Sequence, residues 1–156
     1  MSFAKLSLKG RALKLQGQRE HSQLELQRKL APYVEEGDDL QAILDELEKR
    51  GFISVQRVVD SVIHSKSSRF GTARLVQELR SKGLDDEVVR NASEQLRDTE
   101  LERARELWRK RFGTPPADIK EKAKQLRFMA SRGFSADVAS RVLRDAPYCA
   151  APDSED

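Results

Sequence analysis

Cysteine is nearly absent from the sequence, and long apolar runs are absent altogether. The 156-residue chain has a single cysteine, Cys149, so an internal disulfide is excluded. A chain without disulfides is expected in a reducing compartment, here the cytoplasm. No apolar stretch approaches the roughly 18 residues of a membrane span, and residues 1–5 lack the apolar segment of a signal peptide. The sequence therefore predicts a cytoplasmic protein without a membrane association.

Residues that carry catalysis or bind metals are equally scarce. The two histidines, His21 and His64, have no second histidine or cysteine at metal-ligand spacing. Cys149 has no base near it in the sequence, and Gly10 and Gly17 lack the continuation of a phosphate-binding loop. We therefore expect no enzyme, no metal site and no cofactor.

Aromatic residues make up only 6% of the chain, whereas charged residues make up 35%. This composition supports a modest apolar core and favours an extended arrangement of helices over a thick globule. Even the β-branched run from Val55 to Ile63 has apolar residues at i, i+3, i+4 and i+7, which outweighs its strand propensity. The pattern predicts an all-α fold.

One stretch, from Phe70 to Leu84, contains a complete short helix with marked ends. Thr72 is expected to cap its start, because a threonine hydroxyl accepts a hydrogen bond from a free backbone N–H. Leu75 and Leu79 lie on its apolar stripe, and Gly83 is expected to end it in the left-handed conformation. The basic residues lie off the stripe, so the unit has one face to bury and a basic rim.

The same pattern recurs 50 residues later, where Ser131-Arg132-Gly133 matches Ser81-Lys82-Gly83, and a degenerate copy runs from Ser22 to Gly37. A spacing of this size is typical of helical repeats, and three copies leave about three helices in each. The sequence predicts an elongated array of three tandem three-helix repeats. The expected divisions are a flexible N-terminus at 1–8, repeats at 9–53, 54–98 and 99–145, and a disordered acidic tail at 146–156.

The last repeat is expected to start a new helix near Thr99. Trp108 in this helix has two interpretations. Its helical spacing from Leu101 and Ala104 favours a place in the core, and the alternative is stacking on a nucleic-acid base. Phe70 is interpreted as a packing residue.

Charge is unevenly distributed although the net charge is only +3. Basic residues dominate 1–34, 66–82 and 103–132, and acidic residues dominate the blocks between them. Stacked repeats would align the basic helices along one side, which suits a polyphosphate backbone. The alternative for any single block is a solvated helix face, or, for Arg109-Lys110-Arg111, charge placed at the end of a helix.

Three motifs follow one another along the chain. The first comprises Arg11-Ala12-Leu13-Lys14-Leu15, Gln18-Arg19-Glu20-His21-Ser22, Glu25-Leu26 and Lys29-Leu30; the second comprises Phe70-Gly71, Arg74-Leu75, Glu78-Leu79 and Lys82-Gly83-Leu84; the third comprises Arg132-Gly133-Phe134-Ser135 and Val138. Together they span about residues 9–144 and resemble the motifs of the bacterial RecX regulatory proteins. The chain departs from the family after Gly51-Phe52, where the family commonly has an acidic residue and then an aromatic-Ala pair.

The resemblance implies three tandem three-helix repeats and a modulator of the RecA recombinase. Such proteins bind the filament of RecA on single-stranded DNA and suppress filament growth, ATP hydrolysis, strand exchange and co-protease activity, which affects recombination, DNA repair and the SOS response. ATP belongs to RecA. On this basis we expect a basic face that binds RecA and DNA, made of Arg74, Arg80, Lys82, Arg109, Lys110, Arg111, Lys124, Arg127 and Arg132, with Arg19, Arg28 and Lys29 as further candidates.

Two other functions stay open at this point. A nonspecific helical DNA-binding module would bind bare DNA without RecA, and a protein scaffold would bind little DNA at all. The resemblance leaves open whether the protein caps the ends of the RecA filament or coats the helical groove of that filament. It also does not identify the RecA surface or the preferred DNA form. A helical array whose terminal repeats cap its two ends is expected to be a monomer.

Overall fold

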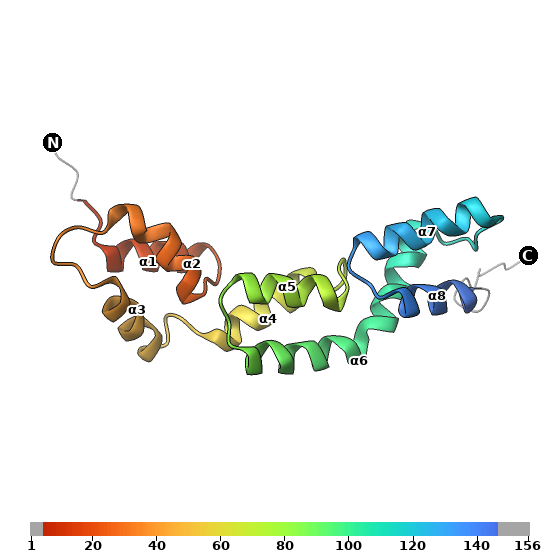
Figure 1. The fold of residues 1–156 in the computed structure, drawn as a ribbon. Coiled ribbons are helices and arrows are strands. Elements are labelled where there is room, and N and C mark those ends of the chain that lie inside the picture. Colours follow the sequence, from red (N-terminus) through yellow and green to blue (C-terminus); the bar gives the residue numbers. More distant parts are fainter. Residues whose placement is uncertain (1–4, 147–156) are drawn as a thin grey trace, which may run out of the picture.

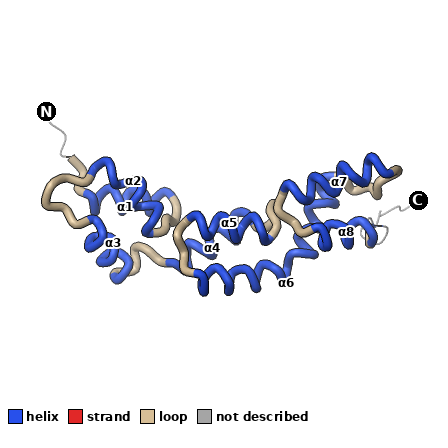
Figure 2. Tube along the Cα trace, in the orientation of Figure 1, coloured by secondary structure: helices blue, strands red, loops and turns tan. Residues whose placement is uncertain are grey.

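The computed structural model describes residues 5–146, and every regular element in that range is a helix (Figures 1 and 2). The elements are α1 (Leu8–Gln18), α2 (Gln23–Leu30), a short 3-10 helix η1 (Ala31–Tyr33), α3 (Leu40–Lys49), α4 (Val55–Lys66), α5 (Thr72–Ser81), α6 (Asp86–Arg111), α7 (Ile119–Ser131) and α8 (Ala136–Arg144). The all-α prediction is confirmed. The predicted tail beyond Ala146, with Cys149, lies outside the described residues. None of the helices within 5–146 has the length and apolar character of a membrane span.

The helices form an elongated array with three separate hydrophobic cores. One core is built by α1, α2 and α3, the next by α4, α5 and the first part of α6, and the last by the rest of α6 with α7 and α8. In Figure 1, α2, α5 and α7 follow one another along one edge, and α3, α6 and α8 along the other. Each group buries its own apolar stripe, so the chain extends by adding groups rather than by thickening one core.

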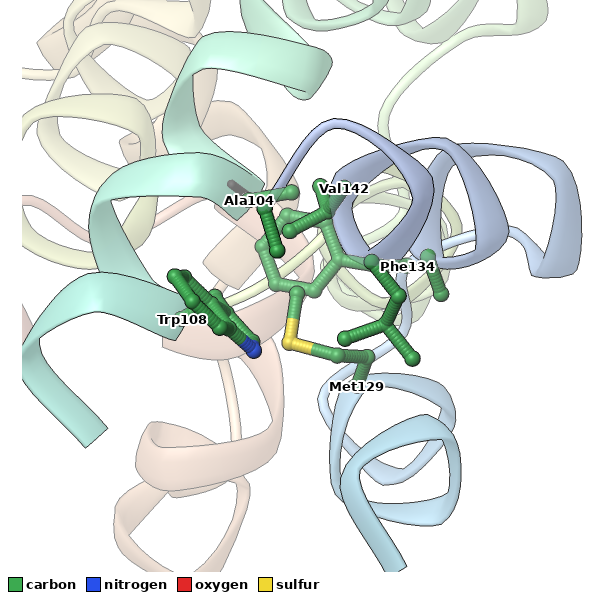
Figure 3. Close-up of a cluster of buried hydrophobic side chains, with 8 residues drawn as sticks. Ala104, Trp108, Met129, Phe134 and Val142 are labelled. Carbon is green, nitrogen blue, oxygen red and sulfur yellow. The ribbon is translucent and has the colours of Figure 1, made fainter. Parts of the chain in front are cut away.

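Trp108 lies at the centre of the last core. Its side chain is fully buried, and Figure 3 shows it beside Met129 and Phe134. Its indole Nε1 donates a hydrogen bond of 2.8 Å to the Oε1 atom of Gln125, which satisfies the only polar group of the ring. The core interpretation of Trp108 is therefore confirmed, and the alternative of base stacking is wrong.

The prediction of a new helix near Thr99 is wrong, because α6 runs without a break from Asp86 to Arg111. The Thr99 hydroxyl donates to the carbonyl of Leu96 at 3.3 Å and accepts the Nε–H of Arg103 at 3.0 Å, instead of accepting a backbone N–H as a cap would. The same carbonyl also accepts a 2.8 Å hydrogen bond from the Nη2 atom of Arg103. Side chains that bind helix carbonyls in this way are a known cause of bending. Figure 1 shows α6 turning along its length so that one helix serves two groups.

The start of α5 is held by α6, and the prediction that Thr72 caps it with its own hydroxyl is wrong. Glu100, which is buried, accepts the backbone N–H of Thr72 at 3.1 Å. Arg103 donates to the carbonyls of Ser67 at 2.8 Å and Phe70 at 2.6 Å. Burial lowers the pKa of Arg103, and the nearby Glu100 carboxylate opposes that effect. Two charged side chains of α6 thus fix the loop that leads into α5.

The first junction joins the start of α2 to the end of α5, and polar side chains form it. The Ser22 hydroxyl donates to the carbonyl of Lys82 at 2.6 Å, and the Lys82 ammonium lies 3.1 Å from Glu25 Oε1. Arg19 pairs with the other oxygen of Glu25 at 2.6 Å. Burial raises the pKa of Glu25, but hydrogen bonds from Arg19, the Ser22 backbone and Lys82 outweigh it and hold the pKa at about 2.

The second junction, between the start of α5 and the end of α7, is also a close contact, but backbone atoms make it. The N–H of Gly71 donates to the carbonyl of Arg132 at 2.7 Å, and a Cβ atom at Gly71 would lie 2.3 Å from the carbonyl oxygen of Gly133. Gly133 has φ +86°, as predicted for the residue that ends each repeated helix, and a Cβ there would lie 2.5 Å from that of Arg74. The beginning of α5 therefore lies directly against the end of α7.

Gly71→Ala should destabilise the protein, because its methyl group would meet backbone atoms that cannot move aside. We expect a loss of about 1–3 kcal/mol in the free energy of unfolding, measured by urea denaturation. The matched control is Gly17→Ala in α1, where an added Cβ meets nothing within 4 Å. The control should be neutral or slightly stabilising. Equal stability of the Gly71 variant and the unmodified protein would contradict this packing.

The Glu25 contact predicts a change in stability with acid. Its folded pKa of about 2 lies below the ordinary 4.5, so the carboxylate adds stability above pH 4.5 that is lost as the pH falls towards 2. Glu25→Gln should lower the melting temperature at pH 7 and flatten its decline between about pH 5 and pH 2. The exposed Glu36→Gln variant should keep the wild-type decline. An unchanged decline in Glu25→Gln would show that this carboxylate does not couple folding to pH.

Candidate nucleic-acid interface

A group of arginine and phenylalanine side chains gathers where α5 meets α6 and α7. We name it the Arg–Phe cluster, and it consists of Arg69, Phe70, Arg74, Arg111, Phe112, Phe128 and Arg132. Around the ring of Phe70, the guanidinium carbon lies 4.2 Å from the centroid for Arg74, and 5.5 Å for both Arg69 and Arg132. At these distances each cation is attracted by the ring.

Arg132 connects this ring to a second one. Its guanidinium carbon also lies 5.1 Å from the centroid of Phe128, which Arg111 approaches at 5.4 Å. Phe112 packs edge-on against Phe128, with the centroids 5.3 Å apart. The cluster is therefore continuous across the second junction, from the loop before α5 to the end of α6.

Helical spacing places these residues on one surface. Phe128 and the C-cap residue Arg132 are four residues apart at the end of α7, so they share a helix face, whereas Phe70 lies in the loop before α5 and meets the Arg74 guanidinium at 4.2 Å. Lys124 lies four residues before Phe128 and extends the same row. The contact between Gly71 and Gly133 then brings the two pairs together.

The cationic side chains of the cluster have no carboxylate partner in the part of the chain that the structure describes. Arg74 donates to the carbonyl of Ser131 at 3.1 Å, and Arg69 to that of Ser65 at 3.3 Å. Carbonyl partners leave the positive charge uncompensated. A hollow of about 390 Å³ lies beside Phe70 and Arg74, next to the Lys66–Glu78 ion pair. Exposed arginine edges beside partly exposed rings can bind phosphates and stack with bases.

The structure separates the twelve predicted basic residues into groups. Arg74, Arg111 and Arg132 belong to the cluster, and Lys124 and Arg127 lie exposed beside it on α7. Arg28 is exposed at the first junction, 3.5 Å from the carbonyl of Ser81. Arg80 lines a different surface, between α5 and α6.

The remaining predicted residues have partners within the protein. Lys82 is only 13% exposed at its side chain and is paired, like Arg19, with Glu25. Arg109 and Lys110 both pair with Glu106 on the exposed side of α6. The ammonium of Lys29 lies 3.0 Å from Nε2 of His21, a buried ring whose pKa is lowered by burial. Carboxylates compensate the charges of Lys82, Arg19, Arg109 and Lys110, and Lys29 is held at His21 in the first group of helices, away from the cluster, so we do not include these five in the candidate interface.

Sequence reasoning missed Arg69, Phe112 and Phe128 and assigned Phe70 to packing. The ring of Phe70 does pack, but it is only half-buried and has three cations around it. One signal could have revealed the site: an aromatic residue four positions before an arginine, which occurs at 70/74 and again at 128/132. Such a spacing indicates a cation–aromatic contact, which forms along α7 at 128/132 and between the loop and the first turn of α5 at 70/74.

Comparison with known proteins identifies the family. Two family profiles match the chain, one described as the second three-helix domain of RecX at residues 56–92 and one as the third at residues 98–143. The regulatory protein RecX of Leptothrix cholodnii is 57% identical over 143 residues, covering 92% of this chain and 91% of that protein. The chain belongs to the RecX family. RecX of Ralstonia nicotianae is also similar, with 50% identity over 141 residues that cover 90% of this chain and 89% of the relative.

Solved RecX structures support the fold. The crystal structure of RecX from Lactobacillus salivarius aligns with a TM-score of 0.72 over 90% of this chain and 95% of that one. The sequences are only 17% identical, so this likeness concerns the arrangement of helices and not the site. The predicted helical repeat array is confirmed, and the relatives place the chain among regulatory proteins.

Arg132→Ala should weaken binding to single-stranded DNA, because it removes the cation shared by both rings while leaving the backbone contact in place. We expect roughly a tenfold loss of affinity at about 0.1 M salt and a salt dependence that is shallower by about one contact. Fluorescence anisotropy with a labelled oligothymidine measures both. The control Arg144→Ala, on the exposed end of α8, should change neither. Equal affinities for both variants would remove the cluster from the interface.

Proposed function

We propose that this RecX-family chain regulates RecA by binding the filament that RecA forms on single-stranded DNA. Bound there, it would suppress filament growth, ATP hydrolysis, strand exchange and co-protease activity, and so limit recombination, DNA repair and the SOS response. The observation that carries this proposal is the Arg–Phe cluster, an uncompensated basic surface that continues from one group of helices to the next. Membership of a family of regulatory proteins supports it.

The shape of the array suits a long, repeating partner. Because α5 and α7 follow one another along one edge, cations at the cluster and at Lys124 and Arg127 are spread along that edge rather than gathered at a point. Such a distribution can contact several phosphates in succession, each contact weak and salt-sensitive. A rod lying along the filament would also occupy the space that an incoming DNA strand or a further RecA subunit needs.

The chemistry of the cluster favours binding to single-stranded DNA and does not select a particular base sequence. Guanidinium groups bind phosphate oxygens, and aromatic rings stack on bases of any identity. We propose that Arg74, Arg111 and Arg132 bind the backbone and that the edges of Phe70 and Phe128 contact unstacked bases. No enzymatic step and no cofactor of this chain is required, since ATP is hydrolysed by RecA.

The cluster also favours a second candidate, a helical module that binds bare DNA without RecA. The two functions differ in stoichiometry. A filament regulator acts by blocking growth, so a few copies affect many RecA subunits, whereas a DNA competitor must cover the DNA. In either case we propose a cytoplasmic protein that acts as a monomer.

Titration of the protein into RecA that is hydrolysing ATP on single-stranded DNA separates the two. We expect inhibition at well below one copy per RecA subunit. Inhibition that appears only at amounts that saturate bare DNA would support the competitor instead. No effect from a folded protein would contradict both. The Arg132→Ala variant, compared with Arg144→Ala, tests whether the same cluster is responsible.

A further inference from the structure

The other side of α5 carries a surface of different character. A groove of about 830 Å³ lies between α5 and α6 and reaches Ser135 in the next group. Val76 and Arg80 of α5 line this groove, whereas Arg74 and Gln77 line the hollow beside Phe70. At 100° per residue these two sets lie on different sides of the helix. A ligand in the groove would therefore leave the Arg–Phe cluster free.

The groove is long and has apolar residues on its α5 wall. The exposed charged residues that α6 contributes run from Asp86 to Arg97, a rise of about 16 Å at 1.5 Å per residue, and the buried Glu100 lies at the far end of the lining. The exposed Ala73 and the half-buried Val76 of α5 form the accessible apolar part of its lining, and Val89 lies beneath them in the core. A strip three helical turns long suits a segment of polypeptide better than a compact small molecule.

Charges of alternating sign edge the groove. Asp86, Arg90, Glu94 and Arg97 follow one another along α6 at spacings of four, four and three residues, and Arg80 faces them from α5. Their spacing would allow ion pairs within α6. Nevertheless, in the described part of the chain none of these five side chains has a hydrogen bond or an ion pair. They are available to a ligand.

The order of the charges indicates which ligand. Two carboxylates among three arginines would repel a phosphate backbone at every second turn, so the pattern disfavours nucleic acid. It complements a helix with basic groups opposite Asp86 and Glu94 and acidic groups opposite Arg90 and Arg97. The apolar face of that helix would lie on Ala73 and Val76. Helix-in-groove binding commonly combines such an apolar face with matched charges.

We propose that the α5–α6 groove binds an amphipathic α-helix about three turns long on the surface of a protein partner. The inference rests on the proposed function, under which that partner is the RecA recombinase. The chain would then bind the filament with two sides of α5: the Arg–Phe cluster on DNA and the groove on protein.

A charge swap tests the groove without changing composition. The double variant Arg90→Glu, Glu94→Arg keeps the net charge and the helix-forming residues but inverts the order of signs. The matched control is Glu46→Arg, Arg50→Glu, which inverts an exposed pair at the same spacing at the C-terminal end of α3. Circular dichroism confirms that both fold. We expect the groove swap to raise the concentration for half-inhibition of RecA ATP hydrolysis at least about tenfold. Its affinity for labelled oligothymidine should change less than about twofold, and the control should match the unmodified protein in both assays.

The other outcomes overturn the inference in distinguishable ways. Inhibition that survives the groove swap would overturn it and leave the proposed function standing. A loss of oligothymidine affinity equal to the loss of inhibition would make the groove a DNA surface. A change only in the sedimentation of the free protein would make the occupant a second copy of this chain. No inhibition by the unmodified protein would overturn the proposed function and this inference with it.

Discussion

The close contact between Gly71 and Gly133 is the constraint on which the candidate interface depends. The N–H of Gly71 reaches the carbonyl of Arg132 at 2.7 Å because neither glycine carries a side chain that would separate the two segments. This contact places Phe70 and Arg74 of one group beside Arg132 of the next. Without this contact, Arg74 with Phe70 and Arg132 with Phe128 would be two separate cation–aromatic pairs. With it, the basic surface is continuous across a boundary between separately packed cores.

The charged residues fall into two sets: those with hydrogen-bond or ion-pair partners that stabilise the fold, and those whose charge faces solvent. Lys82 and Arg19 lie in a junction with Glu25, where hydrogen bonds hold the carboxylate in its charged form. Arg103 and Glu100 similarly fix the loop before α5, where burial makes each unmet hydrogen bond costly. Within residues 5–146 the cations of the cluster have only carbonyls or rings as partners, so their charge remains available to phosphates. Composition and net charge alone do not reveal this division.

Local signals predicted the fold well, and long-range contacts account for what they missed. The repeated apolar stripes ending at Gly83 and Gly133 fixed the helical array, because both features depend on neighbouring residues. The continuity of α6 was not predicted, since a threonine hydroxyl can cap a helix or bind a carbonyl, and tertiary contacts decide which. Lys82 was assigned to the basic face because its partner, Glu25, is 57 residues away. The cluster was missed because its two halves meet only across the junction.

We infer that the junction between α5 and α7 assembles the basic surface that is proposed to bind DNA. The most direct test is the salt dependence of oligothymidine affinity for Gly71→Ala, beside Gly17→Ala, at a temperature where circular dichroism shows both to be folded. We expect a weaker affinity and a shallower salt dependence for Gly71→Ala alone, because Arg132 would no longer share the ring of Phe70. Unchanged affinity and salt dependence in a folded Gly71→Ala protein would show that the basic residues act independently of the contact between α5 and α7.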